Sequence, residues 1–113
     1  MANKVIPTPL FKAKFKRLKK KFKTLESEMR SLTDVLEEVP DTGESLGSGL
    51  YRIRLASKSK GKGKRGGFRV ITYLLTKVED EIEVYLISVY DKSEEQSIKK
   101  ETLLALAKSL DIN

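Results

Sequence analysis

The segment that most constrains the fold is residues 82–89, IEVYLISV, which are apolar on both faces of an extended chain. Successive side chains of a strand point to opposite faces, so a strand of this composition must be covered on both sides. The segment therefore predicts a central strand at about residues 82–90. The acidic residues 79–81 just before it indicate a charged turn and lack the pattern of a dedicated metal site.

Two further strand-like runs, at about residues 50–56 and 68–77, flank a loop whose charged residues are all basic: Lys58, Lys60, Lys62, Lys64 and Arg65. Alternation places Arg52 and Arg54 on the same face of the first run, while Arg69 begins one alternating set of the second. If the runs pair as a hairpin, three arginines and the loop converge on one end of a sheet. Such a concentration of cations favours a polyanionic ligand that carries phosphate.

The remaining segments predict mainly helix. Residues 4–6 indicate a short edge strand that stops at Pro7, and Thr8 with Pro9 has the pattern of a helix N-cap. Apolar residues at spacings of three and four predict helix across residues 9–38, preferably as a hairpin that turns near residues 22–24, with Thr24 as a second N-cap. Residues 40–49 have the composition of an exposed loop. The capping-box spacing of Ser93 and Gln96 predicts a final helix over about residues 94–110.

This order predicts one α+β domain over residues 1–113, with an N-terminal helical hairpin packed on an antiparallel sheet of three to four strands and a C-terminal helix. We expect the other sheet face to be partly open. The 39% hydrophobic and 35% charged residues are typical of a globular protein. No apolar run approaches the roughly 18 residues of a membrane span, and the basic N-terminus does not resemble a signal peptide. We therefore expect a cytoplasmic protein without a membrane partner, a compartment with which the absence of cysteine is compatible.

The chain contains no histidine and no cysteine, which narrows the chemistry. Nucleases with paired histidines, Ser-His-Asp hydrolases and ordinary zinc enzymes all need imidazole or thiolate groups. The net charge of +7 favours nucleic acid or an acidic protein as partner. All charged residues within 1–23 are basic, and so are those within 57–69.

With YRIRL, a basic insert, RVITY, YLISVYDKSE and a helical tail in this order, the chain resembles the RelE/HigB family of toxin–antitoxin toxins, and is most similar to its HigB-like branch. The resemblance covers roughly residues 11–107. It implies a cytosolic endoribonuclease that enters the ribosomal A site of the 30S subunit, cuts messenger RNA there, and is neutralised by a cognate antitoxin. It implies neither a metal nor another cofactor.

The resemblance also implies roles for individual residues. The family's basic positions fall on Arg52, Arg54, Arg69 and Lys92. RelE itself carries a catalytic tyrosine in its final helix, whereas this chain has Ile98 there, so Tyr90 is the substitute that we consider. Arginines can stabilise a phosphorane, and a lysine such as Lys92 or Lys58 can exchange protons if its neighbours lower its pKa.

Several alternatives are open from the sequence. Arg52 and Arg54 are also compatible with the solvated face of a half-exposed strand. We interpret the loop cations as RNA-binding and not catalytic, because a glycine-rich loop positions side chains poorly and is mobile when unbound. The first helix carries further basic residues that would contact ribosomal RNA or simply face solvent: Lys16, Lys19, Lys20 and Lys23. The competing functions are a non-catalytic RNA- or ribosome-binding module and a ParE-like toxin that poisons DNA gyrase.

Overall fold

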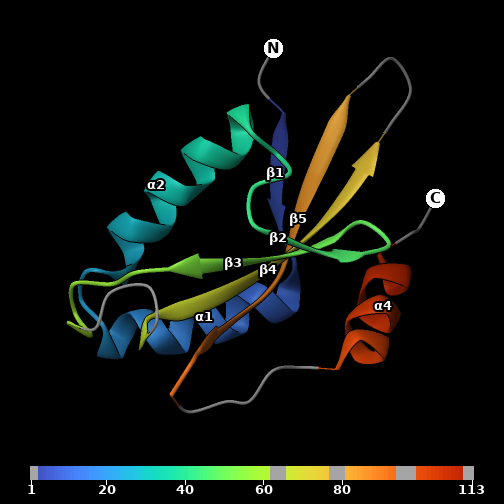
Figure 1. Cartoon of the computed structure of the whole chain (residues 1–113). Helices are drawn as coiled ribbons and strands as arrows, with labels where there is room; N and C mark the ends of the chain where they lie inside the picture. Colours follow the sequence, from blue (N-terminus) through green and yellow to red (C-terminus); the bar gives the residue numbers. More distant parts are fainter. Residues whose placement is uncertain (1–2, 62–65, 77–80, 94–98, 111–113) are drawn as a thin grey trace.

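Short helices and strands follow one another in the order drawn in Figure 1. The computed structural model describes residues 3–61, 66–76, 81–93 and 99–110. Within these ranges the elements are β1 (Lys4–Pro7), α1 (Pro9–Lys21), α2 (Leu25–Glu38), β2 (Glu44–Gly47), β3 (Leu50–Leu55), β4 (Phe68–Thr76), β5 (Ile82–Asp91) and α4 (Lys100–Ser109). The described elements form an α+β fold, as the sequence predicts.

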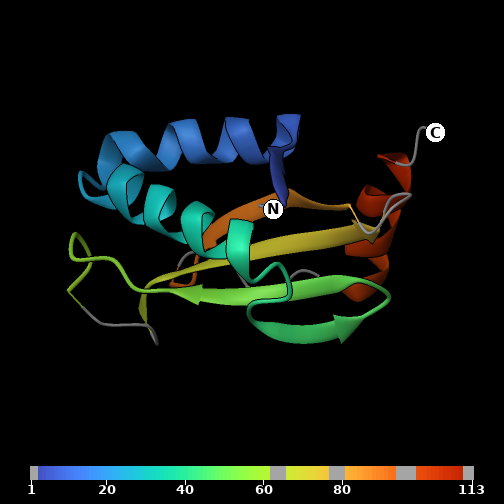
Figure 2. The same cartoon turned by 90° about the horizontal axis from the view of Figure 1, so that it is seen from above.

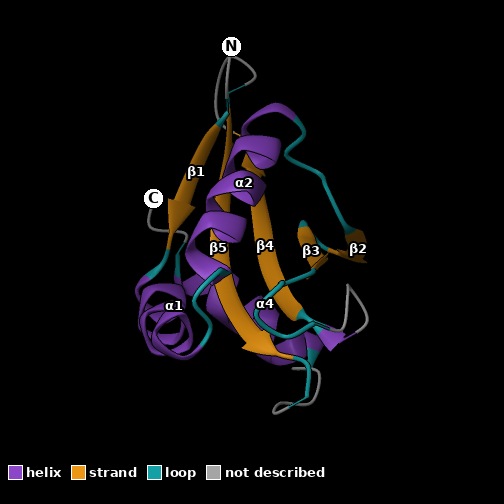
Figure 3. Ribbon diagram, turned by 90° about the vertical axis from the view of Figure 1, so that its left-hand side faces the viewer, coloured by secondary structure: helices purple, strands orange, loops and turns teal. Residues whose placement is uncertain are grey.

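The sheet is mixed and has five strands in the order β1-β5-β4-β3-β2. β1 pairs parallel to β5, and the other three pairings are antiparallel. The prediction of an antiparallel sheet of three to four strands was therefore wrong in strand number and in the direction of one pair. The long connection that parallel strands need runs from β1 through both helices and strands β2 to β4 to β5, and Figure 3 shows the strands side by side in this sheet.

β2 lies inside the segment that the sequence predicted to be an exposed loop. Its four residues, ESLG, have little intrinsic strand preference, so pairing with β3 determines their conformation. Gly43, just before β2, has a φ of +106°, and a Cβ there would lie 2.7 Å from the Arg52 carbonyl oxygen. Glycine thus permits the close approach of β2 to β3.

Two helices, α1 and α2, occupy the segment that was predicted to be helical, and they begin in different ways. Thr8 caps α1, because its Oγ1 accepts a hydrogen bond from the Phe11 N–H at 3.3 Å. Thr24 precedes α2 but makes no side-chain cap to that helix, contrary to expectation. Its hydroxyl instead contacts Ser59 Oγ at 2.7 Å, so it joins the helical turn to the loop after β3.

Both faces of the sheet carry a hydrophobic core. α1 and α2 cover one face, as Figure 2 shows, and pack on buried residues that include Val70, Val84 and Leu86. α4 packs on the other face, over Leu50, Ile71 and Ile87 among others, and so covers part of the face that was expected to be partly open. The prediction of a central strand is confirmed, because β5 lies between β1 and β4 and its residues 86–91 are all buried.

The last helix starts later than predicted. Lys99 has extended backbone angles (φ −64°, ψ 143°), so α4 begins at Lys100 and cannot continue a helix from residue 94. Gln96 and Ile98, which the sequence analysis singled out, lie outside the described residues, as do the charged-turn residues 79 and 80. In the described part of the chain, no helix has the length and apolar character needed to cross a membrane.

Candidate functional site: a cationic face of the sheet

Arg54, Arg69 and Tyr90 form a row across three adjacent strands. Arg54 on β3 lies opposite Arg69 on β4, and Arg69 lies opposite Tyr90 on β5. Side chains directly opposite in an antiparallel pair have Cβ atoms about 5 Å apart. Arg52 projects from the same face one alternation earlier, opposite Ile71. The convergence of the three arginines on one face, which was predicted from alternation, is confirmed.

A β-bulge brings Tyr90 into this row. Ile71 pairs with Ser88 but the next residue, Thr72, pairs with Leu86, so Ile87 is an extra residue on β5. Strict alternation would place Tyr90 on the same face as Val84 and Leu86. After the bulge the faces are exchanged, so Val89 joins the core under α1 and α2, and Tyr90 joins the opposite face.

The arginines of this face differ in exposure and in partners. Arg54 is exposed, whereas Arg69 is only 4% exposed and donates a hydrogen bond from Nη1 to the Phe68 carbonyl at 3.2 Å. Burial, followed by the neighbouring charge of Arg54, lowers the pKa of the Arg69 guanidinium. Two like charges directly opposite each other destabilise a sheet, and a bound anion would relieve this repulsion.

Arg52 already has a carboxylate partner from the strand that the sequence did not predict. Its Nη2 donates to Glu44 Oε1 on β2 at 2.7 Å. This hydrogen bond raises the pKa of Arg52 and lowers the pKa of Glu44. Glu44 is exposed, so it can move aside and leave Arg52 to an incoming anion.

One further cation reaches this face from α1. The ammonium of Lys14 lies over the Tyr90 ring, 5.9 Å from its centroid, and Tyr90 itself is only 2% exposed. We did not single out Lys14 from the sequence. Lys14 lies three residues after Phe11 and four before Leu18, which are both buried, so it lies beside the buried side of α1. This spacing is the feature of the sequence that could have indicated its position.

Lys92 immediately follows Tyr90 and Asp91, as expected for a residue at the end of the last strand. Its side chain is exposed, and its backbone N–H donates to the Gly67 carbonyl at 3.2 Å. That hydrogen bond joins the end of β5 to the start of β4. Lys92 therefore emerges next to the strand ends that carry Arg69 and Tyr90.

Lys60, one of the predicted RNA-binding residues, has a nearly buried side chain that is paired with a carboxylate. Its ammonium contacts the Asp91 carboxylate and Ser93 Oγ, and it lies 5.5 Å from the ring centroids of both Phe22 and Phe68. The side chains of Lys60 and Asp91 are 7% and 3% exposed. Burial alone would raise the pKa of Asp91, but hydrogen bonds from Lys60 and Ser93 outweigh it and lower that pKa. We call this arrangement of Lys60, Asp91 and Ser93 the latch.

The described start of the loop, residues 57–61, is attached to the helical hairpin. Ser59 N–H donates to Thr24 Oγ1 at 3.0 Å, and Thr24 N–H donates back to Ser59 Oγ at 2.8 Å. The Lys58 N–H donates to Glu28 Oε2 at 2.8 Å, while the Lys58 side chain is exposed. Lys60 is therefore held in place by an ion pair, and its predicted role in RNA binding stays a prediction. Lys62, Lys64 and Arg65 lie outside the described residues.

The basic residues of α1 that were predicted from the sequence do not join the arginine row. Lys16, Lys19 and Lys20 border a groove between α1 and α2, on the side of the sheet opposite the arginines. Lys23 is exposed in the turn between the two helices. The predicted cations are thus divided between the arginine face, the loop and this groove.

The arginine face can bind an anion with several phosphate oxygens, because its guanidinium groups hold fixed positions on rigid strands. Among the described residues no group of three or more acidic, histidine or cysteine side chains could hold a metal ion. No protein-family model matches the chain.

Proposed function

We propose that this protein is a RelE/HigB-like toxin, a ribosome-dependent endoribonuclease that cuts messenger RNA and is neutralised by a cognate antitoxin. The observation that carries the proposal is the row Arg54–Arg69–Tyr90, with Arg52 beside it, on one face of the sheet. The order of the elements also supports it, since a helical hairpin precedes the antiparallel strands and a helix follows them. The proposed arrangement is RelE-like, with β1 and β2 as additional edge strands.

The proposed chemistry uses the RNA's own 2′-hydroxyl as the nucleophile. Arg54 and Arg69 would bind the non-bridging oxygens of the reacting phosphate and stabilise the negative charge of the phosphorane. Lys92 lies at the end of the same strands and would donate a proton to the leaving oxygen. Tyr90 is too buried to collect a proton from solvent, so its phenol would orient the neighbouring arginines.

We expect the ribosome to supply the alignment of the RNA that the arginine face does not provide by itself. Glu44, the carboxylate that contacts an arginine of this face, is bound to Arg52, so we propose that the proton of the attacking 2′-hydroxyl passes to a water molecule. Alignment of the message in the A site would contribute the in-line geometry, and correct orientation alone can account for many kcal/mol of a reaction barrier. Free RNA should accordingly be a poor substrate.

The antitoxin would be an acidic protein. The net charge of +7 favours rapid association with a partner of opposite charge. The proposal therefore expects a neighbouring reading frame whose product binds this chain and restores growth when it is coexpressed.

The decisive experiment measures single-turnover cutting of message on programmed ribosomes at saturating protein. Arg54→Ala and Lys92→Ala should each reduce the cutting rate by about 100-fold to 1,000-fold, the usual loss when one charge-stabilising donor is removed. Both side chains are exposed, so the fold should persist, which circular dichroism checks. Arg17→Ala on the exposed surface of α1 is the matched control and should cut normally.

The same assay separates the competing functions. The burial of Tyr90 favours a non-catalytic RNA-binding module as the second candidate, because the phenol that lies in the arginine row is not accessible. That candidate predicts ribosome binding that depends on Arg54, with no cut ends in the message. Equal cutting of naked and ribosome-bound RNA would contradict ribosome dependence, and inhibition of gyrase in place of translation would favour a ParE-like toxin.

A further inference from the structure

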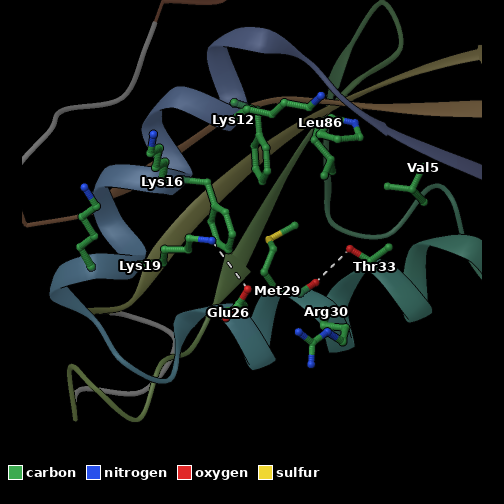
Figure 4. A pocket seen from close by; sticks show the side chains of 13 residues that line it. Val5, Lys12, Lys16, Lys19, Glu26, Met29, Arg30, Thr33 and Leu86 are labelled. Atoms are coloured by element: carbon green, nitrogen blue, oxygen red, sulfur yellow. Dashed lines mark hydrogen bonds and ion pairs between the residues drawn. The ribbon is translucent and has the colours of Figure 1, made fainter.

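α1 and α2 diverge above the sheet and leave a groove of about 590 Å³ between them, seen from close by in Figure 4. Its apolar lining comes from four elements: Phe11 and Phe15 on α1, Met29 on α2, Val5 on β1 and Leu86 on β5. The rings of Phe11 and Phe15 are stacked with centroids 5.7 Å apart. A concave site of this volume with a mainly apolar lining lies in the range of sites that bind small organic molecules.

The rim of the groove is basic, and its charges lie on both helices. α1 contributes Lys12, Lys16, Lys19 and Lys20, and α2 contributes Arg30. The acidic residue of the lining, Glu26, is paired with Lys19 at 3.7 Å, and Figure 4 shows this ion pair crossing between the two helices. An apolar floor below a cationic rim favours a ligand that has both a hydrocarbon part and a negative charge.

We infer that the groove binds a long-chain fatty acid as its carboxylate. The alkyl chain would lie along the stacked rings and against Met29, whose flexible thioether adapts to ligands of irregular shape. The carboxylate would stay at the rim, where the exposed Lys16 and Lys20 lie about one helical turn apart. At the rim the charged head remains partly hydrated, so the ligand avoids the desolvation cost of a fully buried charge.

Nucleic acid and a membrane surface fit this groove less well. RNA would place charged phosphates and sugars against the apolar floor. A membrane surface needs an apolar patch that projects outward, whereas Phe11 and Met29 are only 4% and 5% exposed and lie at the bottom of the groove. A single alkyl chain can enter a concave groove and contact such side chains.

The inference does not rest on the proposed nuclease activity, because the groove and the arginine row lie on opposite sides of the sheet. A fatty acid in the groove would leave Arg54 and Arg69 uncovered. Binding of the fatty acid can therefore be measured without RNA or ribosomes.

Isothermal titration calorimetry of the full chain tests both parts of the ligand. The probes are octanoate, decanoate and dodecanoate, each below the concentration at which it forms micelles. A fully buried methylene contributes about fourfold in affinity and a half-buried one about twofold, so dodecanoate should bind more tightly than octanoate by a factor of about 16 or more. Dodecyltrimethylammonium has the same chain length but a positive head, and it should bind at least tenfold more weakly than dodecanoate. Equal affinities along the series, or for the two heads, would overturn the inference.

The methyl group of Met29 shows where the ligand binds. The chain contains two methionines, so a sample with isotope-labelled methionine methyl groups gives two NMR signals, and Met29→Leu identifies the signal of Met29. Titration with dodecanoate should shift this signal with the same dissociation constant as calorimetry gives. Binding that leaves the signal unchanged occurs elsewhere and overturns the inference. A 12-nucleotide RNA that shifts the signal in place of dodecanoate would assign the groove to nucleic acid and overturn it as well.

Two matched pairs of variants test the rim and the floor. Lys16→Glu/Lys20→Glu should weaken dodecanoate binding at least tenfold, whereas Lys99→Glu/Lys108→Glu, which changes the net charge equally at exposed positions away from the groove, should change it less than threefold. Phe15→Ala should also weaken binding, whereas Leu10→Ala, which removes an exposed apolar side chain elsewhere on α1, should not. The inference is overturned if the Lys16/Lys20 reversal leaves the affinity for dodecanoate unchanged.

Discussion

Replacing Lys60 with methionine should destabilise this protein far more than any other lysine substitution in the described loop. Methionine keeps an unbranched chain against Phe22 and Phe68 but removes the ammonium that pairs with Asp91. A buried carboxylate that loses its cation costs about 3–5 kcal/mol. Asp91 retains hydrogen bonds from the Ser93 N–H at 3.0 Å and Oγ at 2.8 Å, so we expect the lower end, about 3 kcal/mol.

That loss is large on the scale of a single domain. For 113 residues the entropy of unfolding is about 0.24 kcal/mol per kelvin, so the melting temperature should fall by about 12 °C. Urea unfolding followed by circular dichroism gives the free energy directly. Lys58→Met is the matched control, because Lys58 is exposed two residues away and should change stability by less than about 0.5 kcal/mol.

A double-mutant cycle with Asp91→Asn tests whether the pairing itself is responsible. Once the carboxylate is neutral, removal of the Lys60 ammonium leaves no unpaired buried anion, so the double variant should be more stable than the sum of the two single losses by about 1–3 kcal/mol. The reasoning is refuted if the two losses simply add, or if Lys60→Met costs less than about 1 kcal/mol.

Two further predictions concern charge. Folding lowers the pKa of Asp91, so its stabilising contribution is complete above about pH 5 and is lost as the pH falls through the folded pKa. The variant Asp91→Asn should therefore show a weaker dependence of the unfolding free energy on pH between about 5 and 3. Glu44→Gln should bind a 12-nucleotide RNA several-fold more tightly than the unmodified chain, since it removes the anion paired with Arg52; an unchanged or weaker affinity, measured by fluorescence anisotropy at low salt, would exclude Arg52 from the anion site.

The elements with strong periodicity could be predicted from the sequence, and those determined by pairing could not. The apolar stripes of α1 and α2, the Thr8 cap and strands β3 to β5 all carry local signals. β2 carries none, because its residues become a strand only through hydrogen bonds to β3. The start of α4 at Lys100 was not predicted either, and the hydroxyl of Ser93, the expected cap, donates a hydrogen bond to Asp91.

In the candidate site too, some residues could be placed from local sequence patterns and others could not. Alternation within β3 and β4 was enough to place Arg52, Arg54 and Arg69 on one face. Tyr90 could not be assigned to that face, because the bulge at Ile87 reverses the alternation of β5 and has no marker such as glycine. Nor could Lys60 be separated from the other loop lysines, because its burial depends on residues about 30 positions later in the chain.

The latch and the arginine row share strand β5, although they lie on opposite faces of the sheet. Tyr90 and Asp91 are consecutive residues of β5, so Tyr90 belongs to the arginine row while Asp91 points to the side of α1 and α2, where Lys60 and the rings of Phe22 and Phe68 lie. Asp91 also pairs with Phe68, the residue before Arg69, and Lys92 is hydrogen-bonded to Gly67. The ion pair joins the loop after β3 to the end of β5, next to Tyr90 and Lys92 in the chain and opposite the start of β4. We therefore expect Lys60 to act as a positioning residue for this end of the sheet.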